Sequence, residues 1–458
     1  MTHKRDFNMA KLIHISYTLF GIVMMATSCT NENIGGDDIR MTGRKIEFRA
    51  SFPELTTRAT QTTSATLEKI TVSSYITGET SDTPYFTDMT FSKTGNPAIY
   101  VCYDDACVWP DNDTRLRFHA YSPSCEDIIA AGGEATSTGD RISGFKVPGD
   151  IASQFDFVTA ISPGSLIDNK ESGVKLNFKH QLSRIELKAW GNSDSYNLEI
   201  AGSRIGGIGT GGDFSFTSPA DAETTDFTGA WKNVAKGSVE YIFREGDTIV
   251  TLDNSNGAPT SKDDAVSILG NKIGGKNGYD NSAMIVPSVN TPWQYKESPS
   301  NGEDKTDGMY ISVLLRVKDT TPTSTGDGIV YPYTDPSYID EIVYLAVDKS
   351  DSKTVKARLY RQGESYFIDP GHTAQYDPEA DNADVKAFGW AALPKGESLK
   401  PGLVYTYLLN YSNGVGLRDP EDSRPGEPII SDNVAVNVSV EIEDWKEGTN
   451  NDLSVPRK

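Results

Sequence analysis

The feature that most constrains the fold of this chain is a change of phase in its alternation of apolar and polar residues. The first set of positions on the apolar face, two residues apart, is Val174, Leu176, Phe178, His180 and Leu182. After Ser183-Arg184 the apolar set becomes Ile185, Leu187 and Ala189, which lies on the opposite parity. A period of two changes phase only through an extra residue, a bulge or a new strand. We therefore interpret Ser183-Arg184 as a place where the chain passes between sheets or domains.

The length and composition predict a mainly β protein of two domains. A chain of 458 residues exceeds what one hydrophobic core usually supports. Helix signals are scarce, whereas short alternating runs recur between segments rich in Gly, Thr, Ser and Asp, a texture typical of β-sandwiches. We expect two β-sandwich domains that meet near residue 192, over residues 59–192 and 193–458.

The net charge of −21 argues against nucleic acid as a partner. Phosphate binding requires clustered cations, and no Lys/Arg-rich run follows the first residues of the chain.

The N-terminus is typical of an exported lipoprotein. Basic residues precede an apolar run from Leu12 to Ala26, which has the length of the hydrophobic region of a signal peptide and is short for a bilayer span. The run ends in Ala26-Thr27-Ser28-Cys29, which resembles a bacterial lipobox. This predicts a signal peptide over residues 1–28, acylation of Cys29 and a lipid anchor in the outer membrane. An ordinary signal peptide followed by an incidental cysteine is the alternative.

A short amphipathic strand follows the polar tether. Its apolar positions are Ile46, Phe48, Ala50 and Phe52, and Pro53 ends it. Arg58 and Ala59 then lie in a Thr-rich segment, where exposed chain is open to proteases. The alternative interpretation of this segment is a plain linker.

The cysteines leave a disulfide open. Cys102 and Cys107 bracket four residues, so a hairpin at this position would bring them within bonding reach. An oxidising compartment permits the bond, but Cys125 is then left over once Cys29 is acylated. A zinc site is disfavoured because no second pair of ligands stands at a suitable spacing.

Motifs of enzyme chemistry are weak. The run from Gly207 to Gly212 matches GxGxxG, but a strand pattern follows it instead of a helix, so we interpret it as a glycine-rich loop. His119 and His180 are expected to be structural or exposed. Acidic pairs are expected to be solvated turns without a bound metal: Asp104-Asp105, Asp111 with Asp113, and Asp348 with Asp351. The sequence therefore predicts no enzyme, no cofactor and no metal.

The second half alternates strand candidates with long polar loops. Its clearest strand is Val434 to Ile442, in which Val and Ile alternate with polar residues before Asp444-Trp445. A short polar tail remains after it.

Taken in order, these stretches resemble the fimbrillin-like (major-fimbrium-like) family of type V pilus subunits. The resemblance is carried by the lipobox with its downstream Thr-Thr-Arg-Ala and by the ending in Glu443-Asp444-Trp445. It is also carried by three internal runs, which are Trp109 to Pro123, Phe155 to Ala160 and Leu176 to Ile185.

The resemblance implies two transthyretin-like β-sandwiches, export as a lipoprotein, and a mature form found in a fimbrium. It also implies maturation by cleavage between Arg58 and Ala59, which would remove residues 29–58 with their strand. Assembly with other pilin subunits by strand exchange would follow. Because little chain follows the last strand, a tip, anchor or accessory subunit fits better than a stalk subunit.

Two other classes stay open. A glycan-binding surface lipoprotein would share the acidic, β-rich composition and would present exposed aromatic residues such as Trp293, Tyr331 and Tyr333 to a host or bacterial glycan. A structural surface protein without a partner is the third.

Overall fold

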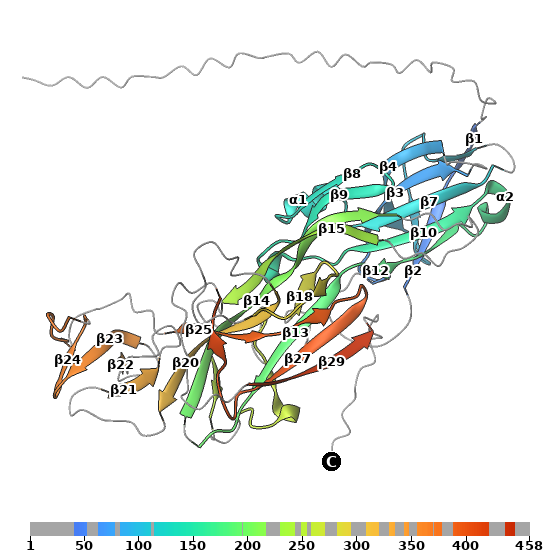
Figure 1. Cartoon of the computed structure of the whole chain (residues 1–458). Coiled ribbons are helices and arrows are strands. Elements are labelled where there is room, and N and C mark those ends of the chain that lie inside the picture. Colours follow the sequence, from blue (N-terminus) through green and yellow to red (C-terminus); the bar gives the residue numbers. More distant parts are fainter. Residues whose placement is uncertain are drawn as a thin grey trace, which may run out of the picture. The chain divides into compact units, whose positions relative to one another are not determined.

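Alternating apolar residues form strands throughout the chain, and the protein is mainly β (Figure 1). The structure is a computed structural model. It describes residues 41–52, 63–77, 83–110, 114–194, 196–216, 230–242, 249–253, 258–270, 282–294, 308–319, 329–334, 343–347, 355–369, 371–377, 388–420 and 436–444.

An eight-stranded sheet, here called the N-terminal sheet, comes first. Its strand order is β11-β2-β5-β4-β3-β7-β10-β12. In that order the strands are Val174–Asn177, Glu47–Ser51, Ile99–Val101, Thr83–Thr94, Lys69–Ile76, Leu116–Ser122, Val158–Gly164 and Lys179–His180. A two-stranded sheet beside it pairs β1 (Met41–Lys45) with β6 (Val108–Pro110). The helices α1 (Cys125–Ala130) and α2 (Leu166–Asn169) and the 3₁₀ turn η1 (Ile151–Ser153) are short.

The N-terminal sheet curls back on itself. Strands β11 and β12 stand at opposite ends of its order, yet Phe178 alone separates them in the chain. The two edges are therefore close in space, and the curled sheet encloses an apolar cluster that includes Phe48, Phe91 and Phe118.

Two further sheets follow. The five-stranded sheet contains β17 (Val266–Ser267), β13 (Ser183–Trp190), β27 (Leu403–Asn410), β29 (Asn437–Asp444) and β18 (Ser282–Ile285). A small sheet pairs β19 (Val289–Asn290) with β26 (Glu397–Ser398), and η2 covers Lys262–Asp264.

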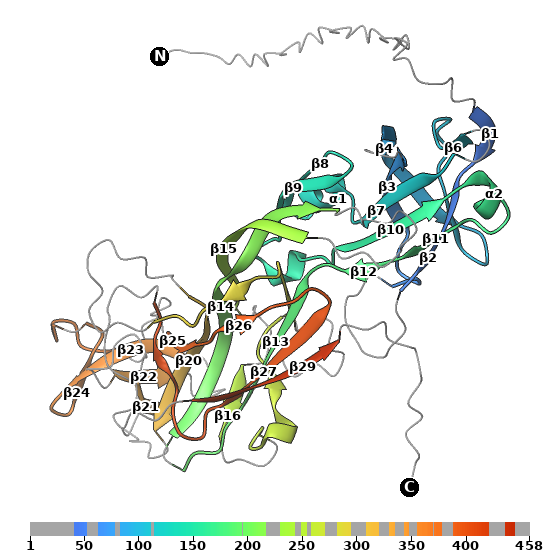
Figure 2. The same ribbon diagram turned by 45° about the vertical axis from the view of Figure 1, so that its right-hand side comes forward.

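The twelve-stranded sheet is arranged around the long strand β14 (Tyr196–Ser215), visible between β15 and β20 in Figure 2. Its main path is β24 (Ser365–Phe367), β23 (Val355–Gln362), β22 (Val343–Val347), β21 (Ile329–Thr334), β20 (Tyr310–Asp319), β14, β9 (Arg141–Lys146) and β8 (Glu134–Ser137). Also attached are β15 (Ala230–Ile242), β16 (Val250–Leu252), β25 (Gly389–Pro394) and β28 (Leu417–Arg418).

The phase change at Ser183-Arg184 marks a passage between sheets, as predicted. Strand β12 ends the N-terminal sheet at His180, and β13 begins in the five-stranded sheet at Ser183. Gln181 joins them, and its backbone N–H donates to the Phe157 carbonyl at 2.8 Å. The new strand buries Ile185, Leu187 and Ala189 in a second apolar core, so the apolar parity follows the sheet that each strand enters.

The domain boundary near residue 192 stays a prediction. Strand β14 pairs on one side with β20 and, in its last residues, with β9, which precedes residue 192. A third apolar cluster also draws residues from both sides, among them Phe145, Phe214 and Met284.

The Gly207–Gly212 run lies inside β14, so its interpretation as a loop was wrong. The glycines fit because neighbours approach the backbone closely: a Cβ on Gly206 would overlap the Tyr310 ring, and Gly207 has a φ of +68°. Within the described residues the run continues as a strand to Ser215 and lacks the strand-turn-helix order of a dinucleotide-binding motif.

Candidate functional site: the N-terminal strand and the groove that holds it

Residues 46–52, here called the leader strand, lie in the interior of the N-terminal sheet. Strand β2 runs parallel to β11, with Phe48 opposite Val174, and antiparallel to β5, with Phe48 opposite Tyr100. Two backbone hydrogen bonds extend this pairing, from Ile46 N to the Cys107 carbonyl at 3.0 Å and from Phe178 N to the Ser51 carbonyl at 2.8 Å. The strand is therefore held by its backbone on both sides.

The apolar face of the leader strand fills the core enclosed by the curled sheet. Ile46 and Phe48 are fully buried, and Phe52 is 7 % exposed. The Phe48 ring meets Phe91 and Phe118 edge to face, with centroids 4.8 and 4.9 Å away. Each buried apolar side chain of this size stabilises the fold by about 1.5–3 kcal/mol, so the leader strand is a major part of this core.

The far end of the leader strand packs at the edge of the sheet. Phe52 stacks on Phe178 with 5.6 Å between ring centroids, and lies 5.9 Å from the His180 ring. His180 Nδ1 in turn lies 2.9 Å from Asp156 Oδ2, and both side chains are buried. His180 therefore contacts the end of the leader strand through Phe52 and lies just before the connection that leads into β13.

Tyr100 of β5, the residue paired with Phe48, is neutral. Tyr100 donates from its hydroxyl to the Leu67 carbonyl at 2.7 Å. Burial, reinforced by the nearby Glu68 carboxylate, raises the pKa of Tyr100 to about 12, so its phenol is neutral at physiological pH.

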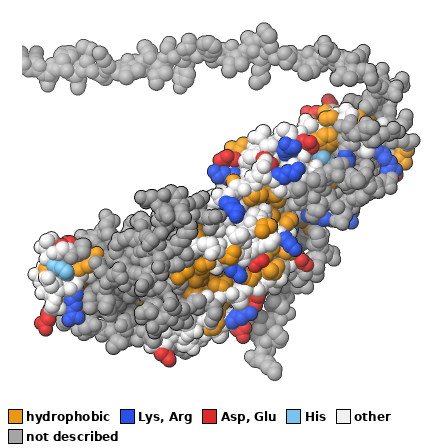
Figure 3. Space-filling model, in the orientation of Figure 1, with side chains coloured by type: hydrophobic (Ala, Val, Ile, Leu, Met, Phe, Trp, Pro, Cys, Tyr) orange, Lys and Arg blue, Asp and Glu red, His pale blue; other side chains and the backbone are white. Residues whose placement is uncertain are grey.

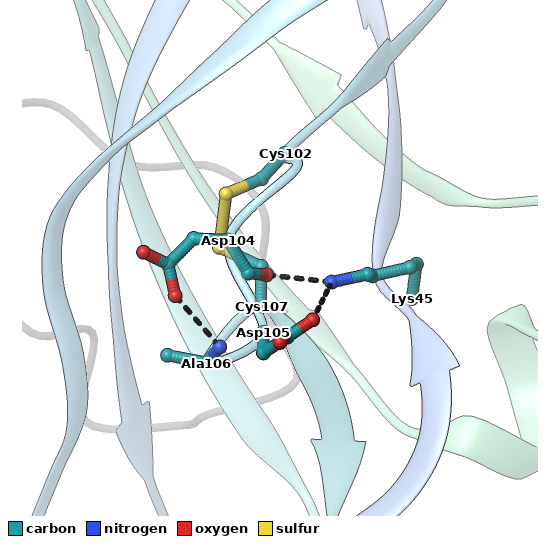
Figure 4. The surroundings of a disulfide bond; sticks show 6 residues. All are labelled: Lys45, Cys102, Asp104, Asp105, Ala106 and Cys107. Carbon is teal, nitrogen blue, oxygen red and sulfur yellow. Dashed lines mark hydrogen bonds and ion pairs between the residues drawn. A yellow bond between two sulfur atoms is a disulfide. The ribbon is translucent and has the colours of Figure 1, made fainter.

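A disulfide-closed turn contacts the start of the leader strand (Figure 4). Cys102 and Cys107 are bonded, with their Cα atoms 6.1 Å apart. The expected hairpin is absent, because β5 pairs with β2 and β4 whereas β6 pairs with β1. The disulfide therefore closes a turn between two sheets. Lys45 Nζ reaches this turn, donating to the Asp104 carbonyl at 2.7 Å and to Asp105 Oδ1 at 3.2 Å.

Three of the predicted site residues, Cys29, Arg58 and Ala59, lie outside the described residues, as do Val434, Trp445 and the acidic pairs at 111–113 and 348–351. Within the described ranges, no cluster of His, Cys, Asp and Glu could hold a metal ion, and no helix is long and apolar enough to cross a membrane.

On the face shown in Figure 3, charged side chains of both signs are interspersed.

His119 was expected to be structural or exposed, and it is buried, at 4 % exposed. Strand β7 is covered on both faces, and the His119 ring stacks on Phe216 with centroids 4.8 Å apart. Burial, reinforced by the Arg117 charge, lowers the pKa of His119 to about 4, so the ring is neutral. His119 is therefore a structural residue of β7, packed against Phe216.

The leader groove is the name used here for β5, β11 and the rings of Phe91, Phe118 and Phe178, which surround the leader strand. Sequence reasoning missed the polar contacts along the rim of this groove. Arg44 and Arg49 donate to the segment after α2, where the acceptors are Glu171 and the Lys170 and Ser172 carbonyls. The basic residues Arg44 and Arg49 were visible in the sequence, but their acceptors, more than 100 positions away, were not.

These features define a mainly β protein in which the strand of residues 46–52 lies inside a sheet, between β5 and β11 of its own chain. The chain belongs to the fimbrillin-like family, whose model matches residues 57–445. It is accordingly a fimbrial surface protein and not an enzyme.

Solved structures with similarity to this chain include candidate cell adhesion proteins and a fimbrial tip protein. One from Bacteroides ovatus is 11 % identical, with 90 % of this chain and 99 % of that chain covered and a TM-score of 0.36. One from Parabacteroides distasonis is 11 % identical, with 89 % and 99 % covered and a TM-score of 0.37. The tip fimbrial protein Mfa3 from Porphyromonas gingivalis, truncated at its C-terminus, is 8 % identical, with 87 % and 99 % covered and a TM-score of 0.29. No curated protein matches. The family assignment rests on the sequence match.

Proposed function

We propose that this chain is a structural or adhesive subunit of a type V pilus, acting at the tip, at the anchor or as an accessory subunit. It is exported as a lipoprotein, acylated on Cys29 and held in the outer membrane, then cleaved after Arg58 and assembled by donor-strand exchange. The observation that carries this proposal is the position of β2, an interior strand between β5 and β11. Residues 53–62 connect this strand to the rest of the chain that follows it.

Cleavage after Arg58 would turn the leader strand into a separate peptide. Its departure would expose the unpaired backbone of β5 and β11 and the apolar pocket that held Phe48. An open edge of this kind accepts a strand from another chain. Since Ile46, Phe48 and Phe52 each contribute about 1.5–3 kcal/mol when buried, refilling the groove is strongly favourable.

The remaining parts of the proposal concern organisation. Two transthyretin-like sandwiches dividing near residue 192 would give one domain that carries the groove and one that lies beyond it. The partners are then other pilin subunits, through the groove, and the outer membrane, through the acylated Cys29. Adhesion to a host or bacterial surface ligand would be a property of the assembled fimbrium.

A glycan-binding function receives no support from the described residues. Trp293 was expected to be exposed but is 7 % exposed and packs edge to face on Tyr310, with centroids 5.9 Å apart. The side chains of Tyr331 and Tyr333 are not among those described.

Limited trypsin digestion tests the proposal. Wild type should be cut first after Arg58, and the cut chain should associate with other subunits of its pilus. Arg58→Ala should resist this cut and stay monomeric, whereas Arg115→Ala, at an exposed arginine outside the leader, should behave as wild type. If Arg58→Ala assembles as well as wild type under the same protease, cleavage-driven exchange is wrong for this chain.

A further inference from the structure

The rim of the leader groove is lined by acceptors for cations. Arg44 pairs with Glu171 at 3.1 Å and also donates to the Lys170 carbonyl. Arg49 Nε donates to the Ser172 carbonyl at 2.7 Å. At the other wall, Lys45 contacts the Asp105 carboxylate and the Asp104 carbonyl, as Figure 4 shows. All three basic residues of residues 41–52 therefore bind acceptors that belong to the groove.

The inward side chains of the leader strand alternate in size. The second apolar position holds the Phe48 ring between Phe91 and Phe118, and the fourth holds the Phe52 ring against Phe178. Between them stands Ala50, beside Leu176 of β11 in the parallel register. The groove thus fits an aliphatic residue, an aromatic ring, a small residue and a second aromatic ring, in that order.

The chain's own valine-rich strand does not match this groove. The alternating positions of 434–442 hold Val or Ile, with no aromatic ring, and no Lys or Arg occurs between residues 434 and 444. Its polar positions include Glu441 and Glu443, which would meet the acidic rim, and Asp444 follows them. In addition, β29 is already paired with β27 from Asn437 to Asp444, and Val438 and Val440 pack against the second core.

We propose that the groove accepts a strand from a different protein and excludes the C-terminal strand of a second copy of this chain. The accepted strand runs parallel to β11, carries aromatic side chains at its second and fourth inward positions, and bears basic residues where Arg44, Lys45 and Arg49 stand. This inference rests on the proposed exchange function and specifies its partner: a heterologous, basic, aromatic donor.

The two kinds of contact contribute unequally. The side chains of the Arg44–Glu171 and Lys45–Asp105 pairs are all at least 37 % exposed, so solvent screens them. Charge should therefore change affinity by about fivefold or less for each pair and should act mainly on the rate of association. The buried rings should dominate, because removing a buried aromatic ring leaves a cavity.

Peptide exchange into the clipped full-length chain tests the proposal. The chain is cut after Arg58, and fluorescent peptides are added in excess and followed by anisotropy and native mass spectrometry. The probes are the peptide 41–52, its variant with Arg44, Lys45 and Arg49 replaced by Glu, its variant with Phe48 and Phe52 replaced by Val, and the peptide 434–444.

We expect the peptide 41–52 to enter and displace the resident strand. The charge-reversed peptide should bind at least tenfold more weakly at low salt, and the Val variant about 100-fold more weakly. The peptide 434–444 should not enter. If 434–444 enters within threefold of 41–52, the groove accepts a second copy of this chain and the present proposal is wrong while strand exchange stands. If 41–52 itself cannot enter, strand exchange and the proposal fail together.

A charge swap on the groove separates direct contact from a general effect of peptide charge. Asp105→Lys with Glu171→Lys should bind the charge-reversed peptide at least fivefold better than wild type does, with a loss of affinity for 41–52. Glu126→Lys, on the exposed face of α1 and outside the groove, is the matched control and should change neither affinity. Equal effects from the groove and control variants would overturn the rim assignment.

Discussion

Replacing Phe48 by Ala should weaken the hold of the sheet on the leader strand more than any other single change in residues 41–52. The side chain is 0 % exposed and its ring meets Phe91 and Phe118 edge to face. Truncation of a buried Phe to Ala costs about 3–5 kcal/mol, through lost burial and the cavity left behind. In the intact chain this lowers the free energy of unfolding. In the chain clipped after Arg58, the same cost falls on the binding of the leader and raises its dissociation constant on the order of 10²–10⁴-fold.

The assay compares Phe48→Ala with Phe214→Ala. Phe214 is also 0 % exposed, but it packs in the third cluster, with Phe157 and Trp231 about 5 Å away, and that cluster includes no residue of the leader strand. Each protein is clipped, diluted and passed over a sizing column, and native mass spectrometry reports the fraction that retains the N-terminal fragment. Phe48→Ala should lose the fragment while Phe214→Ala keeps it. Equal retention by Phe48→Ala and wild type, or equal loss by the two variants, would refute the reasoning.

Three further predictions follow. Reduction of the Cys102–Cys107 bond, or Cys102→Ser, should lower the free energy of unfolding by about 2 kcal/mol, as expected for a loop of this length. It should also speed loss of the clipped leader. Denaturant melts with and without reductant measure the change in the free energy of unfolding. Because the pKa of His119 is lowered to about 4 from 6.5, the unfolded chain binds the proton more readily. The free energy of unfolding should therefore fall by about 2 kcal/mol as the pH is lowered from 7 to 5. His119→Phe should reduce this dependence on pH in denaturant melts across the same range. A clickable fatty acid should label wild-type cells' protein and not Cys29→Ala; equal labelling would place the anchor elsewhere.

Local patterns predicted the strands but not their partners. The alternation of Ile46, Phe48, Ala50 and Phe52 is enough to predict a strand with one buried face. That β11, more than 120 residues later, lies beside it depends on tertiary packing, which no local pattern encodes. The phase change at Ser183-Arg184 was more informative, because a change of buried face requires a change of sheet.

Each error has its own physical cause. The hairpin at Cys102–Cys107 was expected because short loops favour pairing of the strands they join, yet β6 pairs with β1 instead. Whether His119 is structural or exposed stayed open because parity distinguishes the two faces of a strand but not what covers them, and Phe216 covers this one. The glycine run was taken as a loop because glycine weakens strands, whereas here it allows Tyr310 and Gly308 to approach β14.

The central claim is that the leader strand leaves when this chain enters a fimbrium. N-terminal sequencing of the chain recovered from sheared, washed fimbriae of cells that express it tests this most directly. The account predicts a mature N-terminus at Ala59, with the fragment that contains residues 46–52 absent from the fibres. A chain in the fibres that still begins at an acylated Cys29 and retains residues 46–52 would contradict it.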